Sequence, residues 1–309
     1  MLPTWLRGST AHGRQLSTRT TMTQFTDDLI VKRLRWVMLG VMLFSMIATL
    51  SGQPQDFWTH PESAVRFDGL SIYDKTNHKF EFFLGHSCEA YVFACFVYFA
   101  ATFVLVSVLP KKTALIATFS FIFAHFYGGS NWLAVRWHYG VRGPSVYQFV
   151  LAIFVTLAAF PGPEKARFAL KRLPWVAVGA LLLDFTNTLI GQPHSYWQHP
   201  GAVHEANALS RMFLLHGWFA FSLYAVVYCC VILWLASVLP VTAALICVFA
   251  FIFGGYGGAT NWFFYEWRMG MEAPVLLGLA LSVAVVLLAF PETRKVHADR
   301  SLAGGRVAV

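Results

Sequence analysis

The chain contains an internal repeat, in which residues 34–161 and 174–291 are two copies of one unit. Within them, residues 121–140 align with residues 251–270 without a gap, and eight of the twenty positions are identical. Other aligned positions follow by adding 130 residues or, further upstream, 139 residues, as in Ser107-Val-Leu-Pro110 with Ser237-Val-Leu-Pro240, Gly52-Gln-Pro54 with Gly191-Gln-Pro193, and His86 with His216. Such a repeat predicts two halves with the same fold.

The composition of both copies is typical of a membrane protein. Charged residues make up 12% of the chain and apolar residues 57%, whereas about 25% of a soluble domain is charged. A helix of about 20 mostly apolar residues spans the hydrocarbon core of a bilayer. Eight segments meet this requirement, namely 34–51, 82–109, 113–134, 145–161, 174–190, 212–239, 241–264 and 273–290. We therefore predict an all-α integral membrane protein with eight transmembrane helices.

Each copy contains four of these segments, so the chain is predicted to be a tandem duplication of a four-helix unit. Because four is an even number, both units are expected to have the same orientation in the membrane. The remaining segments are a basic tail at 1–33, expected to be disordered, a basic linker at 162–173 and a second tail at 292–309. All three are predicted to be cytoplasmic.

The distribution of Lys and Arg supports this orientation. With cytoplasmic termini, sixteen Lys and Arg residues lie on the cytoplasmic side and seven on the other, as the positive-inside rule requires. These residues are scattered over the membrane margins. The net charge of +8 is therefore explained by topology and by contact with the lipid bilayer. It does not indicate a nucleic-acid partner, which would need a folded basic surface.

Most polar residues shared by the two copies map to the non-cytoplasmic ends of the predicted helices. They are Gln53/Gln192, His60/His199, Asn77/Asn207, His86/His216 and Asn131/Asn261. We expect them to form one layer, so that a binding site would open outward. The outer loops also carry Trp58 and Trp197, and tryptophan is common both at membrane interfaces and at protein contacts. These loops are therefore candidate surfaces for protein partners.

His86 and His216 are the first candidate ligands of a cofactor. They occupy aligned positions in the predicted helices 82–109 and 212–239. If these helices face each other, the two imidazoles could hold a divalent metal or serve as axial ligands of a haem. The alternative is that each histidine bonds a carbonyl group of its own loop and helps to fold it.

A second set of candidates lies within the predicted helices. Glu89 follows His86 by one turn, and Asp184 and His125 lie inside the apolar segments. An ionisable group at the centre of a membrane costs about 2.5–3.5 kcal/mol and therefore faces protein or water. With three asparagines, Asn131, Asn187 and Asn261, these residues are candidates for an ion pathway or a binding site. The alternative is that they form hydrogen bonds that hold the bundle together.

Arg136 and Glu266 are aligned residues of opposite charge. Two halves related by a twofold axis would bring such residues toward each other across that axis. We therefore predict a salt bridge between Arg136 and Glu266 that links the two halves.

The second outer loop is rich in histidine. His194, His199, His204 and Glu205 lie within twelve residues, and both side-chain types are ligands of zinc. The spacing is not that of a helical metal site, and Pro200 interrupts the run. A solvated or hydrogen-bonded loop is the alternative interpretation.

Three functions remain open on this sequence. The first is a transporter or binder of a small molecule, an ion or a lipophile, with an outward-facing polar site between the repeats. The second is a non-catalytic subunit or scaffold of a larger membrane complex. The third is a haem- or metal-binding oxidoreductase subunit. Motifs of nucleotide-binding proteins, zinc proteases and serine hydrolases are not found in the chain, so an enzyme is not favoured.

Overall fold

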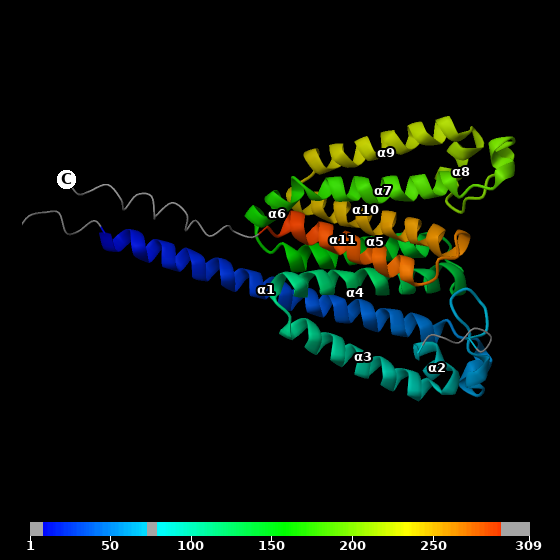
Figure 1. Cartoon of the computed structure of the whole chain (residues 1–309), viewed down its shortest axis with the longest axis horizontal. Helices are drawn as coiled ribbons and strands as arrows, with labels where there is room; N and C mark the ends of the chain where they lie inside the picture. The colour runs from blue at the N-terminus through cyan, green and yellow to red at the C-terminus, as the bar shows by residue number, and fades with distance from the viewer. Residues whose placement is uncertain (1–8, 73–78, 292–309) are drawn as a thin grey trace, which may run out of the picture.

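A computed structural model describes the backbone of residues 9–72 and 79–291, and the side chains of residues 28–72 and 80–291. Apart from one isolated bridge between Val65 and Ser71, these ranges contain no β-structure. The α-helices are α1 (Ser9–Ser51), α2 (Lys79–His86), α3 (Cys88–Val108), α4 (Lys111–Asn131), α5 (Arg142–Ala159), α6 (Pro163–Leu170), α7 (Leu173–Ile190), α8 (Ala208–Leu215), α9 (Trp218–Val238), α10 (Val241–Asn261) and α11 (Glu272–Ala289). The protein is therefore all-helical in these ranges (Figure 1).

Short helices complete the fold. Those with the tighter 3-10 geometry are η2 (Gln55–Trp58), η3 (Pro61–Ser63), η6 (His194–Trp197) and η7 (Pro200–Ala202). The π-helices η5 (Trp132–Arg136) and η8 (Trp262–Glu266) continue α4 and α10. All six lie at one end of the bundle, with α2 and α8, and we call it the loop end (Figure 1). The opposite end, from which α1 projects, is the tail end.

Seven helical segments of the described chain are long and apolar enough to cross a membrane. They are Asp28–Ser51, Cys88–Val108, Arg142–Ala159, Leu173–Ile190, Trp218–Val238, Val241–Glu266 and Glu272–Ala289. The chain is therefore a multi-pass membrane protein. The segment predicted at 113–134 corresponds to α4, which is not among the seven and carries Lys111, Lys112 and His125. Helix α4 packs against α1 and α11, so protein covers much of its surface.

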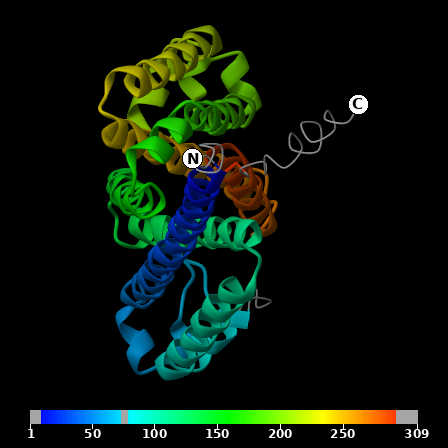
Figure 2. The ribbon, with the colours of Figure 1, turned by 90° about the vertical axis from the view of Figure 1, so that its left-hand side faces the viewer.

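Helices α4 and α10 form the centre of the bundle. The most extensive contacts join α7 to α10 and α1 to α4, and α3 and α9 pack outside these pairs. The fourth long helix of each half crosses to the other half, since α5 packs mainly on α10 and α11 mainly on α4. Figures 1 and 2 show the result, a flat bundle with α3 at one edge and α9 at the opposite edge.

Phenylalanine rings fill the contact between the halves. Phe119 stacks on Phe249 with their centroids 6.2 Å apart, and the rings of Phe123 and Phe253 are 5.1 Å apart. Near the tail end the ring of Phe160 lies 5.5 Å from that of Phe290. Each pair joins two residues that are 130 positions apart in the sequence. Equivalent residues therefore meet each other at the interface, as they do across a twofold axis.

The predicted helices 82–109 and 212–239 are each broken near one end, so the expectation of two continuous helices is wrong. The breaks separate α2 from α3 and α8 from α9. In the first half, the Ser87 hydroxyl accepts a hydrogen bond from the Ala90 amide and begins a new helix. In the second half, Gly217 has φ 96°, which favours glycine. Helices α3 and α9 then have 21 residues each, or about 30 Å, which matches a bilayer.

The basic tail predicted at 1–33 is also partly helical, because α1 begins at Ser9. Ile30 and Val31 are buried, so apolar packing extends this helix beyond the predicted span. The predicted linker at 162–173 contains the short helix α6. The predicted tail at 292–309 lies outside the described residues.

Candidate functional site

The Gly-Gln-Pro motifs attach the outer loops to the helices. In the second half, the Gln192 amide nitrogen donates to the carbonyl oxygens of Thr188, at 2.8 Å, and of His204, at 2.9 Å. The His204 amide donates to the Gln192 side-chain oxygen at 2.8 Å. Gln53 makes the same three bonds, to the Thr49 carbonyl and to both backbone groups of Val65. These bonds show that His204 is structurally equivalent to Val65.

The glycine of each motif lies under a tryptophan. A Cβ atom on Gly191 would be 2.3 Å from the indole of Trp262, and one on Gly52 would be 2.2 Å from that of Trp132. The Gly-Gln-Pro motif and the Asn-Trp motif of each half therefore form one packed unit. This unit places the loop that follows it against the end of α10 or α4.

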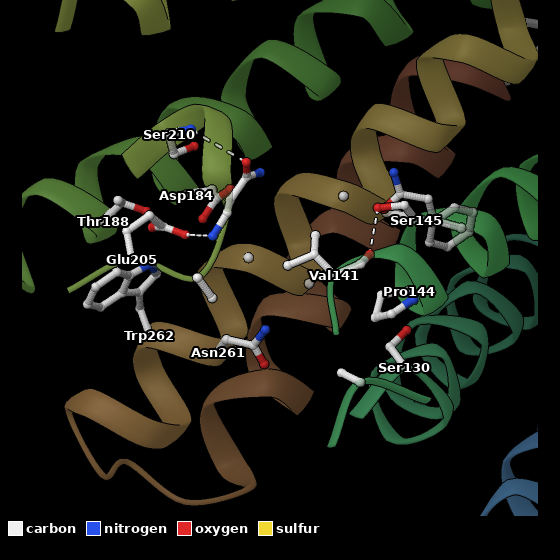
Figure 3. A pocket seen from close by; sticks show the side chains of 18 of the residues that line it. Ser130, Val141, Pro144, Ser145, Asp184, Thr188, Glu205, Ser210, Asn261 and Trp262 are labelled. Carbon is white, nitrogen blue, oxygen red and sulfur yellow. Dashed lines mark hydrogen bonds between the residues drawn. The ribbon is translucent and has the colours of Figure 1, made fainter. Parts of the chain in front are cut away.

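A cavity of about 750 Å³ lies at the loop end. Its walls come from α4 and α5 of the first half and from α7, α9, α10 and the loop around Glu205 of the second half. Figure 3 shows Ser130, Val141, Pro144 and Ser145 on one wall and Asp184, Thr188, Glu205, Ser210, Asn261 and Trp262 on the other. The cavity therefore lies between the two halves.

Phe67 of the first loop and the three aromatic residues that pack around it have small residues at their aligned positions. Phe67 contacts three rings, those of Tyr127, Phe264 and Tyr265, with centroid distances of 5.4–6.3 Å. The aligned positions are all smaller and all line the cavity, namely Ala206, Gly257, Ala134 and Val135. Part of the cavity thus occupies the place that corresponds, across the twofold axis, to this aromatic cluster.

Asp184 is the central acidic residue of the cavity. Its carboxylate packs against α10, where a Cβ atom on Gly258 would lie 2.3 Å from either carboxylate oxygen. Within the described residues, Asp184 makes no hydrogen bond and no ion pair. The aligned residue in the first half is Ser45, which faces Gly128 in the same way. A partly buried carboxylate without a partner needs a proton, water or a cation to balance its charge.

Glu205 lies beside Asp184 on the same wall (Figure 3). Burial raises the pKa of the Glu205 carboxyl above its ordinary value, while the amides of Asn207 and Ala206 act in the opposite direction. The backbone amide of Asn207 donates a hydrogen bond to the Glu205 carboxylate at 2.6 Å. The aligned residue in the first half is Arg66, which pairs with Asp68 at 3.4 Å. The two halves therefore have opposite charges at this position.

Arg136 and Glu266 have separate partners, so the predicted salt bridge between them is wrong. Arg136 donates from Nε to the Gly52 carbonyl at 3.1 Å, where the end of α1 favours a cation. Glu266 contacts His204 Nδ1 at 3.2 Å. Each side chain therefore contacts its own half. Arg136 contacts the end of α1, and Glu266 contacts the loop that follows α7. Of the two, Glu266 lines the cavity.

Two buried hydroxyl groups of the cavity wall have no hydrogen-bond partner among the residues that the structure describes. They belong to Tyr127 and Ser130, whose residues are 1% and 7% exposed. Both come from the last turns of α4, close to Asn131, whose side-chain amide donates to the Tyr127 carbonyl at 3.0 Å. Unpaired buried hydroxyl groups cost free energy.

His86 and His216 do not form a common ligand site. His86 is the last residue of α2 and His216 follows the last residue of α8, and these two helices lie near opposite edges of the bundle in both views (Figures 1 and 2). Both residues are exposed, and His86 Nδ1 contacts the Phe82 carbonyl at 2.8 Å. The expectation that they face each other is wrong, because α4 and α10 occupy the centre of the bundle.

The other predicted residues divide between the cavity and the helix contacts. Asp184, Asn131, Asn261 and Glu266 line the cavity. Asn187 is buried beside it, with its amide nitrogen 3.5 Å from the Ala259 carbonyl. Two others lie elsewhere, since Glu89 is exposed in the first turn of α3 and His125 contacts the Tyr98 hydroxyl at 3.2 Å. His125 therefore links α3 to α4.

The histidines of the second outer loop are not gathered with other candidate ligands around a common point in the described part of the chain. The described residues contain no group of three or more His, Cys, Asp or Glu side chains arranged to hold a metal ion. Of the four loop residues singled out in the sequence, His204 and Glu205 line the cavity.

Several residues of the cavity were not expected from the sequence. Tyr224 and Tyr228 of α9 and Gln148 of α5 all line it. Single aromatic or amide residues in an apolar helix carry little information about what they face. The sequence feature that does indicate the cavity is the replacement of Phe67 by Ala206, and it can be seen only when the two outer loops are aligned.

The fold and the cavity define a multi-pass helical membrane protein with a cavity at one end that is lined by both polar and apolar side chains. Comparisons with known protein families, with characterised proteins and with solved structures found no match for this chain.

Proposed function

We propose that this protein binds or transports a small molecule through the cavity between its halves. The observation that carries the proposal is the cavity of about 750 Å³, which brings Asp184 of α7, Glu205 of the loop before α8 and Glu266 of η8 to one space, together with several hydroxyl groups. Ligand sites of this size are common between the helices of bundles. Asp184 lies within the apolar segment Leu173–Ile190, and an ionisable group in such a segment is commonly retained for function, because it is costly to insert.

We further propose that the chain is a tandem duplication of a four-helix unit with eight membrane-spanning helices. The contacts between Phe119 and Phe249, Phe123 and Phe253, and Phe160 and Phe290 support a twofold axis along the membrane normal. The excess of Lys and Arg at the tail end supports cytoplasmic termini. With this orientation, the cavity opens on the non-cytoplasmic side.

Filling the cavity tests the proposed function. Replacing Ala206 with phenylalanine places in the second loop the ring that Phe67 provides in the first. A panel of organic cations, organic anions, sugars and nucleosides is added to purified protein, and the midpoint of thermal unfolding is measured. We expect at least one solute to raise the midpoint of the wild-type protein and not that of the Ala206→Phe variant.

The matched control is Ala208→Phe, because Ala208 is exposed at the start of α8 and does not line the cavity. This variant should respond to the same solute as the wild-type protein. If no solute acts on the wild-type protein, or if the filled variant responds equally, the cavity is not a binding site. Uptake of the identified solute into proteoliposomes then distinguishes a transporter from a binding protein.

A second candidate function is that of a subunit or scaffold of a membrane complex. It is favoured by two exposed tryptophans at the loop end, Trp58 and Trp197, which are 56% and 48% exposed. Tryptophan is enriched at protein interfaces. Isolation of the protein with a partner at fixed stoichiometry, and loss of that partner in the Trp58→Ala and Trp197→Ala variants, would support this function.

A further inference from the structure

We infer that the ligand of the cavity is a small organic cation, such as a protonated or quaternary amine, bound by Asp184 and Glu205. This inference rests on the proposed function and gives the chemical class of its ligand. It is carried by the charge of the cavity, by the aromatic rings in its walls and by the lack of a partner for Asp184 among the described residues.

The charged groups of the cavity are mostly acidic. Asp184, Glu205 and Glu266 line it, and the described lining residues include no lysine or arginine. His204 is the one basic group among them, and it already contacts Glu266 at 3.2 Å. Asp184 and Glu205 therefore remain to balance the charge of a ligand. A partly buried pair of acidic groups attracts cations and repels anions.

The aromatic residues of the same walls fit a cation that also has an apolar surface. Tyr224 and Tyr228 of α9 and Trp262 of η8 line the cavity together with the acidic residues. The faces of tyrosine and tryptophan rings attract ammonium groups, and quaternary amines are commonly bound in this way. Small apolar positions at Ala206 and Gly257 leave room for the methyl or methylene groups of such a ligand.

A bare metal ion fits this arrangement less well. A divalent cation requires several oxygen ligands within about 2.0–2.6 Å. In the described part of the chain, no three acidic, histidine or cysteine side chains are grouped closely enough to hold a metal ion. A cavity of about 750 Å³ is also much larger than one ion. The acidic groups are therefore arranged around a molecule.

The pH dependence of binding should follow the acidic groups. Burial raises the pKa of Glu205, so this carboxyl loses its charge at a higher pH than an ordinary glutamate. Asp184 of α7, Tyr224 of α9, Glu266 of η8 and His204 face the same space. Protonation of the Glu205 carboxylate makes the cavity less negative. Affinity for a permanently charged amine should therefore fall as the pH is lowered, and Glu205→Gln should weaken this dependence.

The experiment compares choline with 3,3-dimethylbutan-1-ol, which has the same shape without the charge. Binding to the purified full-length protein is followed by calorimetry and by the fluorescence of tryptophan. We expect saturable binding of choline and at least about tenfold weaker binding of the neutral alcohol. Asp184→Asn and Glu205→Gln should each weaken choline binding about tenfold or more. Glu89→Gln is the matched control, because Glu89 is an exposed acid of α3.

Size-exclusion profiles and unfolding midpoints establish that the variants are folded. Equal binding of choline and the neutral alcohol, or unchanged choline binding in folded Asp184→Asn and Glu205→Gln, would overturn the inference. So would no binding of either probe. In each case, the proposed function still stands if a solute of another class stabilises the wild-type protein and not Ala206→Phe. If no solute does so, both the inference and the proposed function fail.

Discussion

Replacing Gly191 with alanine is expected to destabilise the protein by about 3 kcal/mol or more, the upper part of the range for overpacking a well-filled interior. The added Cβ atom would lie 2.3 and 2.4 Å from two ring carbons of Trp262 and 2.9 Å from the Asn187 carbonyl oxygen. Neither neighbour is the end of a flexible side chain, so the indole ring has to leave its place. The amount of monodisperse protein in detergent and its thermal midpoint measure the effect.

The matched control for Gly191→Ala is a second glycine of the same helical segment. Gly191 caps α7 and Gly179 lies within it, and a Cβ atom on Gly179 would have no heavy atom within 4 Å. Gly179→Ala should therefore keep the thermal midpoint of the wild-type protein. If the clash with the indole is the cause, Trp262→Ala should cost less in the Gly191→Ala background than alone. Equal midpoints for Gly191→Ala and Gly179→Ala would contradict the close contact between Gly191 and the Trp262 indole.

Replacing Gln192 with leucine is expected to lower the free energy of unfolding by about 2–4 kcal/mol. The side chain is 5% exposed and makes three hydrogen bonds of 2.8–2.9 Å. Each bond contributes about 0.5–1.5 kcal/mol, and a buried polar group that loses its partner costs about 1–3 kcal/mol. Leucine has a similar size, so the loss reports on hydrogen bonds more than on packing. Thermal and denaturant unfolding in detergent measure it.

Two further variants separate the hydrogen bonds from general effects of the loop. Gln198 lies in the same loop and is exposed, so Gln198→Leu should leave stability unchanged. Gln192→Glu keeps the size but replaces the amide nitrogen, which donates to the Thr188 and His204 carbonyls, with an acceptor. It should be at least as harmful as Gln192→Leu at neutral pH. A stable Gln192→Glu variant would contradict the role given to this side chain.

The sequence predicted part of the site because some of its features are local. Asp184 stands out as an acid in an apolar helix, and Asn131 and Asn261 stand out because they are aligned. The histidine pair His86 and His216 stood out for the same reason, yet the structure places it at opposite edges of the bundle. Alignment within a repeat identifies equivalent positions. It does not say how far those positions lie from the axis.

The membrane class and most of the long helices could be read directly from the chain, because the length of an apolar run and the position of a proline or a capping residue act locally. The break at Ser87 was missed, because a side-chain cap within an apolar run resembles an ordinary helical residue. The crossing of α5 and α11 to the opposite half, and the cavity that it helps to enclose, depend on how surfaces from distant segments fit together. The replacement of Phe67 by Ala206 shows this dependence, since one ring fills a space whose other walls come from α4 and η8.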